Sequence, residues 1–245
     1  MRETWWRVGG WAVHGCEAGD GPPLVLVHGL GVSGRYFLPI ARTLAGRFRV
    51  VVPDLPGFGL STRPRRPLRL DELSETLDRL ADAIGFRRAT FLANSYGCQV
   101  VTRLAVTHPE RVERLVLVGP TVDDSARDPV RQAARLLVDG YHEPGSLVAI
   151  VLSDYLRAGP VTVATGAAEA LRHRIEEDAR RLAAPALVVR GARDPLVPQP
   201  WVERLTAAFR AGELHVIAGA PHAAHFTHPD AVAALVTAGT PPGPR

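Results

Sequence analysis

The sequence predicts an α/β protein with a mostly parallel, doubly wound sheet and an inserted helical cap. Short runs of β-branched and aliphatic residues, such as residues 24–27, alternate with longer segments of helical spacing. This alternation is typical of a parallel sheet that is covered by helices on both faces. It breaks once, between residues 123 and 181, where helical patterns occur without a convincing strand. The 245 residues, of which 46% are hydrophobic, are enough for one large domain with its own core.

The composition and the cysteine count exclude several other classes of protein. A charged fraction of 22% and a mean hydropathy of +0.03 exclude intrinsic disorder, collagen and a coiled coil. No apolar run approaches the roughly 20 residues that cross a bilayer, and residues 1–10 contain no signal-peptide core. Because Cys16 and Cys98 cannot build a disulfide framework, we expect a cytoplasmic, reduced protein.

The positive charge of the chain does not predict a nucleic-acid partner. All 29 basic residues are arginine, and the formal net charge is +4. The densest basic cluster, Arg63, Arg65, Arg66 and Arg69, is broken by prolines and lies in a predicted loop. Nucleic-acid binding favours such a cluster on a regular element with interleaved aromatic side chains. We therefore expect this cluster to be a solvated loop, with no nucleic-acid partner.

The individual elements are predicted from periodicity and from turn residues. Residues 3–16 predict two short strands around Gly9-Gly10, which is a hairpin signal. The other predicted strands are 24–27, 48–52, 89–93, 115–118, 187–189 and 214–217, and the predicted helices are 33–46, 70–84, 96–107, 201–210 and 229–237. Asp71 is the expected cap of the helix over 70–84. The Pro/Gly-rich tail from Gly239 to Arg245 is expected to fray.

The segment Ala93-Asn94-Ser95-Tyr96-Gly97 is the strongest chemical signal in the sequence. It follows a predicted strand and opens a predicted helix, which is the context of a nucleophile elbow. A serine on so sharp a turn needs small residues two positions to either side, and Ala93 and Gly97 meet that need. The pentapeptide alone is also compatible with a serine at an ordinary helix N-cap.

A second segment offers backbone N–H donors that would bind a negative oxygen at such a site. His28-Gly29-Leu30-Gly31 follows the strand over 24–27, and its glycines let backbone amides turn toward the elbow. The amides of Leu30 and Tyr96 are the expected oxyanion hole, which binds the negative oxygen formed in acyl transfer. His28 itself is expected to hold the loop and to transfer no proton.

Two more polar residues follow predicted strands. Asp194 lies just past the strand over 187–189, and His222 follows the strand over 214–217. Open α/β sheets build their sites at these carboxyl ends. The order serine, aspartate, histidine along the chain is that of one known arrangement of a catalytic triad.

These segments resemble the α/β-hydrolase superfamily over residues 22–238. The resemblance includes residues 53–61, a turn after the second parallel strand, and Ala184-Pro185 before the strand that carries Asp194. It implies α/β-hydrolase topology, with a core formed by residues 1–120 and 185–245 and a helical cap over 121–184. It also implies Ser95 as nucleophile, His222 as general base and acid, and Asp194 as the residue that orients the imidazole, without a cofactor.

Several alternatives for these roles stay open in the sequence. Some members of the superfamily carry the acid after the strand that here ends near Val118, where Asp123 or Asp124 would serve. Near His222, both His225 and His228 are further candidates for the base.

Two other chemical roles, a metal site and a cysteine nucleophile, are not expected. The three histidines have no carboxylate or thiolate at metal-ligand spacing, so we expect no metal site. Cys98 is expected to be a small buried side chain and not a nucleophile.

The resemblance implies hydrolysis of a small, mostly apolar ester, lactone or related acyl substrate through an acyl-enzyme on Ser95. Asn94 before the serine is also similar to C–C bond hydrolases, which act on diketone-like substrates, although Gly31-Val32-Ser33-Gly34 and His222-Ala223 depart from their pattern. A ligand-binding member of the fold without hydrolytic activity is the third possibility.

The cap is expected to roof the substrate pocket with apolar side chains. The candidates for this lining are Tyr141, Leu152, Tyr155 and Leu156, with His142 as a weaker one.

Overall fold

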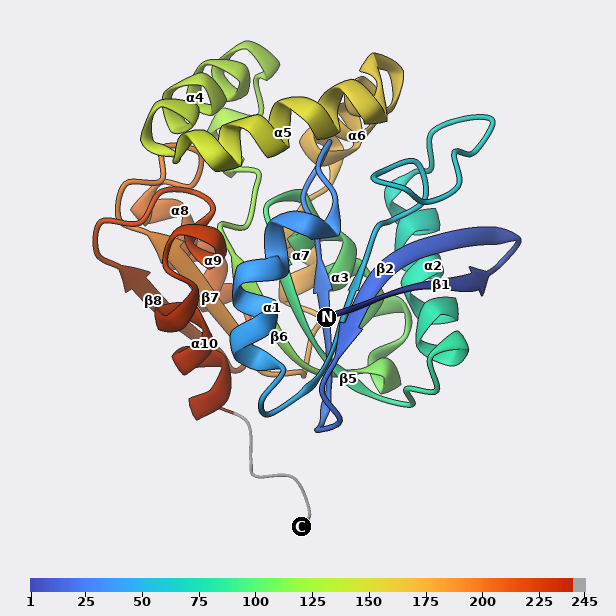
Figure 1. The fold of residues 1–245 in the computed structure, drawn as a ribbon. Helices are drawn as coiled ribbons and strands as arrows, with labels where there is room; N and C mark the ends of the chain where they lie inside the picture. Colours follow the sequence, from blue (N-terminus) through green and yellow to red (C-terminus); the bar gives the residue numbers. More distant parts are fainter. Residues whose placement is uncertain (240–245) are drawn as a thin grey trace.

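The computed structural model describes residues 1–239 and confirms the predicted mostly parallel, doubly wound sheet (Figure 1). The strands are β1 (Arg2–Val8), β2 (Trp11–Ala18), β3 (Pro23–Val27), β4 (Arg49–Pro53), β5 (Ala89–Asn94), β6 (Val112–Val118), β7 (Ala186–Gly191) and β8 (Gly212–Ile217). They lie in the order β1-β2-β4-β3-β5-β6-β7-β8. β2 pairs antiparallel with β1 and β4, and the other neighbours are parallel. The expected fraying of the tail concerns residues 240–245, which lie outside the described residues.

The helices beside the sheet follow the predicted segments with one correction. They are α1 (Leu38–Leu44), preceded by the 3₁₀ turn η1 (Gly34–Phe37), α2 (Leu70–Ala83), α3 (Tyr96–Thr107), the short turn η2 (Pro109–Arg111), α8 (Gln199–Ala208), α9 (Ala224–Thr227) and α10 (Pro229–Ala238). Asp71 does not cap α2, because the helix already begins at Leu70. The Glu72 carboxylate accepts the N–H of Arg69 at 2.9 Å and so satisfies an amide at the helix start.

The core is built on both faces of the sheet, because successive strand residues point to opposite sides. In β3, Leu24 and Leu26 pack toward α1 and α10, whereas Val25 and Val27 pack toward α2 and α3. Helices α2, α3 and α8 cover one face, and α1, α9 and α10 cover the other (Figure 1). Burial on both faces explains why the strands are continuous apolar runs in the sequence.

The order of the strands determines where a site can form at their carboxyl ends. β3 lies between β4 and β5, so the chain crosses over β3 on its way from β4 to β5. At such a switch point the loops after adjacent parallel strands diverge and leave a crevice at the carboxyl ends. The loops that begin at His28 and Ser95 follow β3 and β5 and therefore border this crevice.

The chain between β6 and β7 is helical. It forms η3 (Asp124–Ala126), α4 (Pro129–His142), α5 (Gly145–Ala158), α6 (Pro160–Arg172) and α7 (Ile175–Ala179). We call α4, α5 and α6 the inserted helices; Figure 1 shows them together above the sheet. α7 also falls within the cap expected over 121–184, yet it packs against α3 and α8, and Ile175 and Ala179 are buried in the core. Its pattern matches that of a cap helix because both bury one apolar face.

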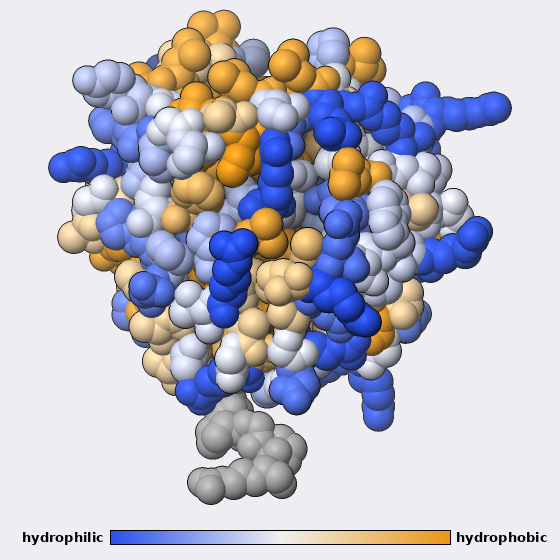
Figure 2. Space-filling model, in the orientation of Figure 1, coloured by the Kyte–Doolittle hydropathy of each residue, from blue (hydrophilic) through white to orange (hydrophobic). Residues whose placement is uncertain are grey.

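The inserted helices carry most of the large apolar side chains that are exposed. These are Val130, Leu136, Leu137, Val138 and Tyr141 of α4, Leu152 and Leu156 of α5, and Val161 of α6. Figure 2 shows the resulting apolar surface at the top of the molecule. Among the described residues no single helix is long and apolar enough to cross a membrane, and α5 and α6 meet that criterion only as a pair bent by 102°.

Candidate active site

Ser95 stands on the turn between β5 and α3. Its φ of 56° makes it the only non-glycine residue with a positive φ in the described part of the chain. Such a backbone costs on the order of 1–3 kcal/mol and persists only where the surroundings hold it. The Ser95 N–H donates to the carbonyl of Val118 at 3.0 Å. Gly97 has no room for a side chain, since a Cβ would lie 2.5 Å from the carbonyl oxygen of Val27.

The two amides expected to form an oxyanion hole lie in the segments that border this turn. Tyr96 is the first residue of α3, and Leu30 is in the loop after β3. That loop approaches the turn closely, because a Cβ on Gly29 would lie 3.2 Å from the Cβ of Ser95. Within the described residues, neither the Leu30 nor the Tyr96 N–H donates to a protein acceptor. Both donors are therefore available to a ligand oxygen.

The imidazole of His222 is held by the carboxylate of Asp194. Nδ1 of His222 lies 2.7 Å from Oδ2, while Oδ1 accepts the amides of Leu196 and Val197 at 2.8 and 3.1 Å. Since a carboxylate only accepts, Nδ1 carries the proton, and Nε2 is the unprotonated nitrogen of the neutral ring. Nε2 is buried without a hydrogen-bond partner among the described residues, and His222 lines the same cavity as Ser95. The pair can accept a proton from a group in that cavity.

Two further carboxylates, from α4, hold the backbone around the histidine. Asp139 accepts the His222 N–H at 3.1 Å, and Glu143 accepts the Ala223 N–H at 2.7 Å. Burial disfavours a charged imidazole, but the negative charges of Asp194, Asp139 and Glu143 outweigh it and raise the pKa of His222 to about 9. Burial also raises the pKa of Asp139, and it raises that of Glu143 to about 7. Neither acid was predicted from the sequence.

Gly119 is another residue that the sequence analysis missed. It directly follows β6 and has a φ of 58°. A Cβ there would lie 2.8 Å from Nδ1 of His222 and 3.2 Å from Oδ2 of Asp194. Only glycine therefore leaves space for the imidazole and carboxylate to meet. A glycine directly after a predicted strand was the available signal.

The structure separates Asp194 from the other candidate acids. Asp123 accepts from Ser125 and pairs with Arg135 at 3.0 Å, and Asp124 pairs with Arg204 at 2.6 Å. Both carboxylates thus pair with side chains other than the histidine.

The other candidate histidines are also engaged elsewhere. His225 is fully buried and packs between the rings of Tyr36 and Phe37, with centroids 4.6 and 4.3 Å away. His228 contacts Thr227 through Nδ1 at 2.9 Å. Among the described residues, the one group of possible metal ligands is Glu75, Asp78 and His108, and it contains none of these three histidines.

His28 and Cys98 take the structural places expected for them. His28 donates from Nδ1 to the carbonyl of Gly29 at 2.8 Å, and its Nε2 accepts the N–H of Leu55 at 2.9 Å. It thereby joins the loops after β3 and β4. The Cys98 thiol is fully buried, and burial raises its pKa well above the usual range, which disfavours the reactive thiolate.

Asn94 links three parts of the site through its side chain. Its amide nitrogen donates to the carbonyl of Val118 at 2.9 Å and to that of His222 at 3.4 Å. Its amide oxygen accepts the hydroxyl of Tyr36 at 2.9 Å, and that hydroxyl accepts the N–H of Gly29 at 2.8 Å. This buried network connects the loop after β3, the end of β5 and the histidine loop.

A cavity of about 370 Å³ contains the exposed edges of Ser95 and His222. Most of its other walls are apolar. The apolar lining consists of Leu30, Val32, Leu136, Leu137, Leu147, Val148, Val151, Leu152 and Leu196, and the polar lining includes Tyr36, Asn94, Asp139, Glu143 and Tyr155. No arginine is among the described lining residues, although the chain has many.

The roof matches the expected pocket residues only in part. Leu152 and Tyr155 line the cavity, and the Tyr155 ring lies where a Cβ on Gly31 would be, at 2.5 Å. Tyr141 and Leu156 do not line it, and they are 89% and 84% exposed. His142 is also exposed and outside the lining. The reason is helical rotation: each residue turns by about 100°, so Leu156 faces away when Tyr155 faces the cavity.

Comparisons with known proteins agree with this architecture. A family model described as alpha/beta hydrolase fold matches residues 22–143, and a model described as TAP-like protein matches residues 151–241. The pimeloyl-[acyl-carrier protein] methyl ester esterase of Aeromonas salmonicida is 30% identical, with 89% of this chain and 95% of that protein covered. Haloalkane dehalogenase 2 of Mycobacterium bovis is also 30% identical, with 91% and 90% covered. This chain belongs to the α/β-hydrolase superfamily.

A solved structure has a similar three-dimensional fold. The 2-hydroxy-6-oxo-6-phenylhexa-2,4-dienoate hydrolase of Rhodococcus sp. strain RHA1 has a TM-score of 0.83 to this α/β hydrolase. It is 26% identical, and 97% of each chain is covered. The names of these relatives denote an esterase, a dehalogenase and a dienoate hydrolase, so they support hydrolase chemistry for this chain without fixing its substrate.

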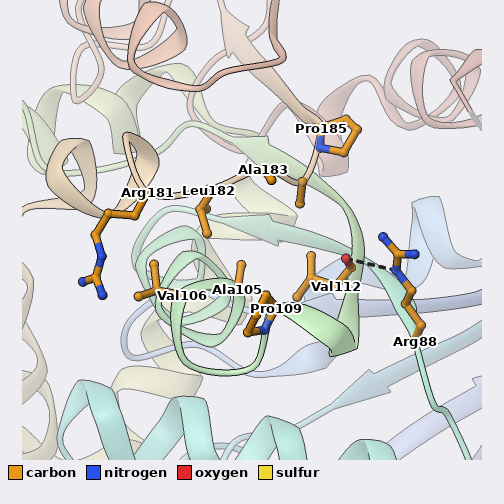
Figure 3. Close-up of a pocket in the computed structure, with 10 residues that line it drawn as sticks. Arg88, Ala105, Val106, Pro109, Val112, Arg181, Leu182, Ala183 and Pro185 are labelled. Atoms are coloured by element: carbon orange, nitrogen blue, oxygen red, sulfur yellow. Dashed lines mark hydrogen bonds between the residues drawn. The ribbon is translucent and has the colours of Figure 1, made fainter.

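A second cavity of the α/β hydrolase, of about 330 Å³, lies at the amino-terminal ends of the central strands (Figure 3). Its walls include Arg88 before β5, Val112 at the start of β6 and Pro185 before β7. None of the candidate catalytic residues lines it. Because sites of such sheets form at the carboxyl ends of the strands, the cavity at Ser95 is the candidate active site.

Proposed function

We propose that this α/β hydrolase cleaves a small, mostly apolar ester, lactone or related acyl substrate through an acyl-enzyme on Ser95. One observation carries the proposal. Ser95, on its strained turn, lines the same cavity as the unpartnered Nε2 side of His222, whose Nδ1 is held by Asp194. These are the nucleophile, base and orienting acid of a triad.

In the proposed first step the Ser95 hydroxyl attacks the carbonyl carbon while Nε2 of His222 takes the hydroxyl proton. The carbonyl electron pair moves to oxygen, and the amides of Leu30 and Tyr96 bind the oxyanion. Collapse of the tetrahedral intermediate breaks the bond to the leaving group, which receives the proton from His222. The acyl group remains on Ser95.

In the second step a water molecule replaces the leaving group. His222 takes a proton from this water as it attacks the acyl carbon, and returns the proton to Ser95 when the acid product leaves. Asp194 keeps the imidazole in one tautomer throughout. The reaction uses no cofactor.

C–C bond hydrolysis of a diketone-like substrate is the second candidate function. It is supported by the Rhodococcus hydrolase, whose name contains a dienoate, and by Asn94 before the serine. The cavity of this chain offers less support for an anionic substrate, because its lining includes Asp139 and Glu143 and no arginine among the described residues.

A panel of p-nitrophenyl esters of graded chain length, with lactones and vinylogous diketones alongside, tests the proposal. We expect turnover of esters or lactones by the wild-type protein and background rates for Ser95→Ala with an unchanged circular dichroism spectrum. Turnover of the diketones alone would favour the second candidate. Binding of the compounds without turnover would favour the ligand-binding alternative.

A further inference from the structure

The two acids at the end of α4, Asp139 and Glu143, transfer no proton in the proposed mechanism, yet both line the same cavity. Asp139 lies in the last turn of α4, and Glu143 is the residue that directly follows the helix. Each uses one carboxylate oxygen to accept a backbone amide of the histidine loop, at His222 and Ala223. One oxygen per carboxylate is thus committed to holding the loop.

The second oxygen of Glu143 is the unusual group. Oε2 is buried and has no hydrogen-bond partner among the described residues. A buried carboxylate oxygen without a donor is costly, on the order of 1–3 kcal/mol or more. Because Glu143 lines the candidate active-site cavity, a rotation of its carboxylate would present this buried oxygen to a donor on a bound ligand.

The charges around the cavity favour a cationic donor. Asp139 and Glu143 line the cavity, and His222 is the one basic residue among the described lining residues. Arg190 donates to the backbone carbonyl of Asp194 at 3.1 Å and His142 lies near Asp139, but neither lines the cavity. When His222 is neutral, as a base must be, no positive side chain lining the cavity balances these carboxylates. A ligand carboxylate would then stand near like charges in a partly desolvated space, which is unfavourable.

The rest of the cavity restricts the remainder of the ligand. Val148, Val151 and Leu152 of α5 and Leu136 and Leu137 of α4 present apolar surface to it. An aliphatic chain or ring fits such walls, with its polar group directed to the acidic end.

We propose that Asp139 and Glu143 make this cavity select acyl substrates that carry a cationic, hydrogen-bond-donating group on an apolar chain, and reject substrates that carry a carboxylate. This inference rests on the proposed function, because it names the substrate class of the same site. Glu143 is the residue that contacts the cationic group, and Asp139 adds charge.

Three p-nitrophenyl esters of matched length test the selection: 6-aminohexanoate, heptanoate and the heptanedioate monoester. They end in an ammonium, a methyl and a carboxylate group. At pH 8 the wild-type kcat/KM should be highest for the ammonium ester and lowest for the carboxylate ester, with about 100-fold between them. One charge-assisted hydrogen bond is worth about 10- to 100-fold. Equal rates for the ammonium and carboxylate esters would overturn the inference.

Glu143→Gln tests the residue. The amide can still accept the Ala223 N–H, but it has no charge, so the ratio of ammonium to carboxylate ester should fall about 10-fold. Glu177→Gln, an exposed acid outside the cavity, removes the same charge and should leave the ratio unchanged. If Glu143→Gln slows all three esters equally, the acid only positions the loop and the inference is wrong.

A binding measurement separates this inference from the proposed hydrolysis. Above pH 9, where His222 is mostly neutral, calorimetry with Ser95→Ala should detect hexylammonium binding at least about 10-fold tighter than that of heptanoate. If no ester is hydrolysed but this preference holds, the proposed function fails and the charge selection stands. If the neutral ester is hydrolysed in a Ser95-dependent way and no charge preference appears in rate or binding, the reverse is true. Should Glu143→Gln not fold, Asp139→Asn should shift the same ratio in the same direction.

Discussion

The floor and the roof of the candidate active-site cavity are built in different ways. The floor consists of Ser95, Asp194 and His222, each directly at or shortly after the carboxyl end of a strand. The roof consists of side chains from α4 and α5. β5 and β7 are held in register by neighbours on both sides and β8 is held by β7, whereas α4 makes few close contacts with the other elements.

This difference has a consequence for chemistry and specificity. At the floor, backbone geometry leaves little choice: the positive φ of Ser95, the packing of Gly97 and the space at Gly119 each exclude most substitutions. At the roof, lining side chains such as Val151, Leu152 and Tyr155 stand on ordinary helical backbone, which accepts most residue types. We infer that the floor fixes the reaction and the roof fixes the substrate.

The largest effect is expected at the floor. Asp194→Asn should lower kcat/KM by about 10⁴, because the imidazole loses its partner and its tautomer. Asp123→Asn and Asp124→Asn are the controls, since their carboxylates pair with Arg135 and Arg204 instead. Ester hydrolysis under kcat/KM conditions measures all three. A larger loss for Asp123→Asn or Asp124→Asn would move the acid to the loop after β6.

A matched pair of leucines compares the stability of the two regions. Leu187 in β7 is 1% exposed, so Leu187→Ala should lower the free energy of unfolding by about 2–5 kcal/mol. Leu156→Ala on the outer face of α5 should change it by no more than about 0.5 kcal/mol. Urea denaturation with a common m-value gives both numbers. Similar losses for the two variants would mean that α5 packs as tightly as the sheet.

The pH dependence connects floor and roof. Only the neutral imidazole can take the Ser95 proton, and the neighbouring carboxylates raise the pKa of His222 to about 9. The rate should therefore rise with pH up to about 9, by about 100-fold between pH 6 and pH 8. Asp139→Asn removes a negative charge beside the imidazole, so the midpoint should move to lower pH. A midpoint that stays in place would show that α4 does not influence the base.

The smallest expected effect is on chain-length preference. Leu152→Ala should lower kcat/KM for p-nitrophenyl octanoate relative to acetate by up to about 10-fold, because only the long chain reaches the roof. Leu156→Ala, an equal truncation on the exposed face, should leave that ratio unchanged. Equal losses on both esters for Leu152→Ala would indicate that the change acts through stability or through the triad.

The same contrast explains what the sequence could and could not predict. The residues at the strand ends could be predicted, because strand runs, turn glycines and chain order place Ser95, Asp194 and His222 at one edge of a parallel sheet. Gly119 was missed although it directly follows a predicted strand, since its role depends on where the imidazole of His222 lies.

Which faces of the inserted helices line the cavity could not be predicted in this way. Their apolar residues are spread around α4 and α5, and Leu137 and Tyr141 remain exposed, so periodicity does not single out an inner face. Asp139 and Glu143 are four residues apart in sequence like any surface pair, and only the docking of α4 on the histidine loop brings them to the site.

Covalent labelling of Ser95 tests the central claim most directly. A fluorophosphonate probe reacts with a serine that a histidine activates, and mass spectrometry of the peptides identifies the labelled residue. We predict one adduct per chain, located on Ser95, absent in Ser95→Ala and formed much more slowly in Asp194→Asn. No adduct on the folded wild-type protein, or an equal adduct on Ser95→Ala, would contradict the account of this cavity as a serine hydrolase site.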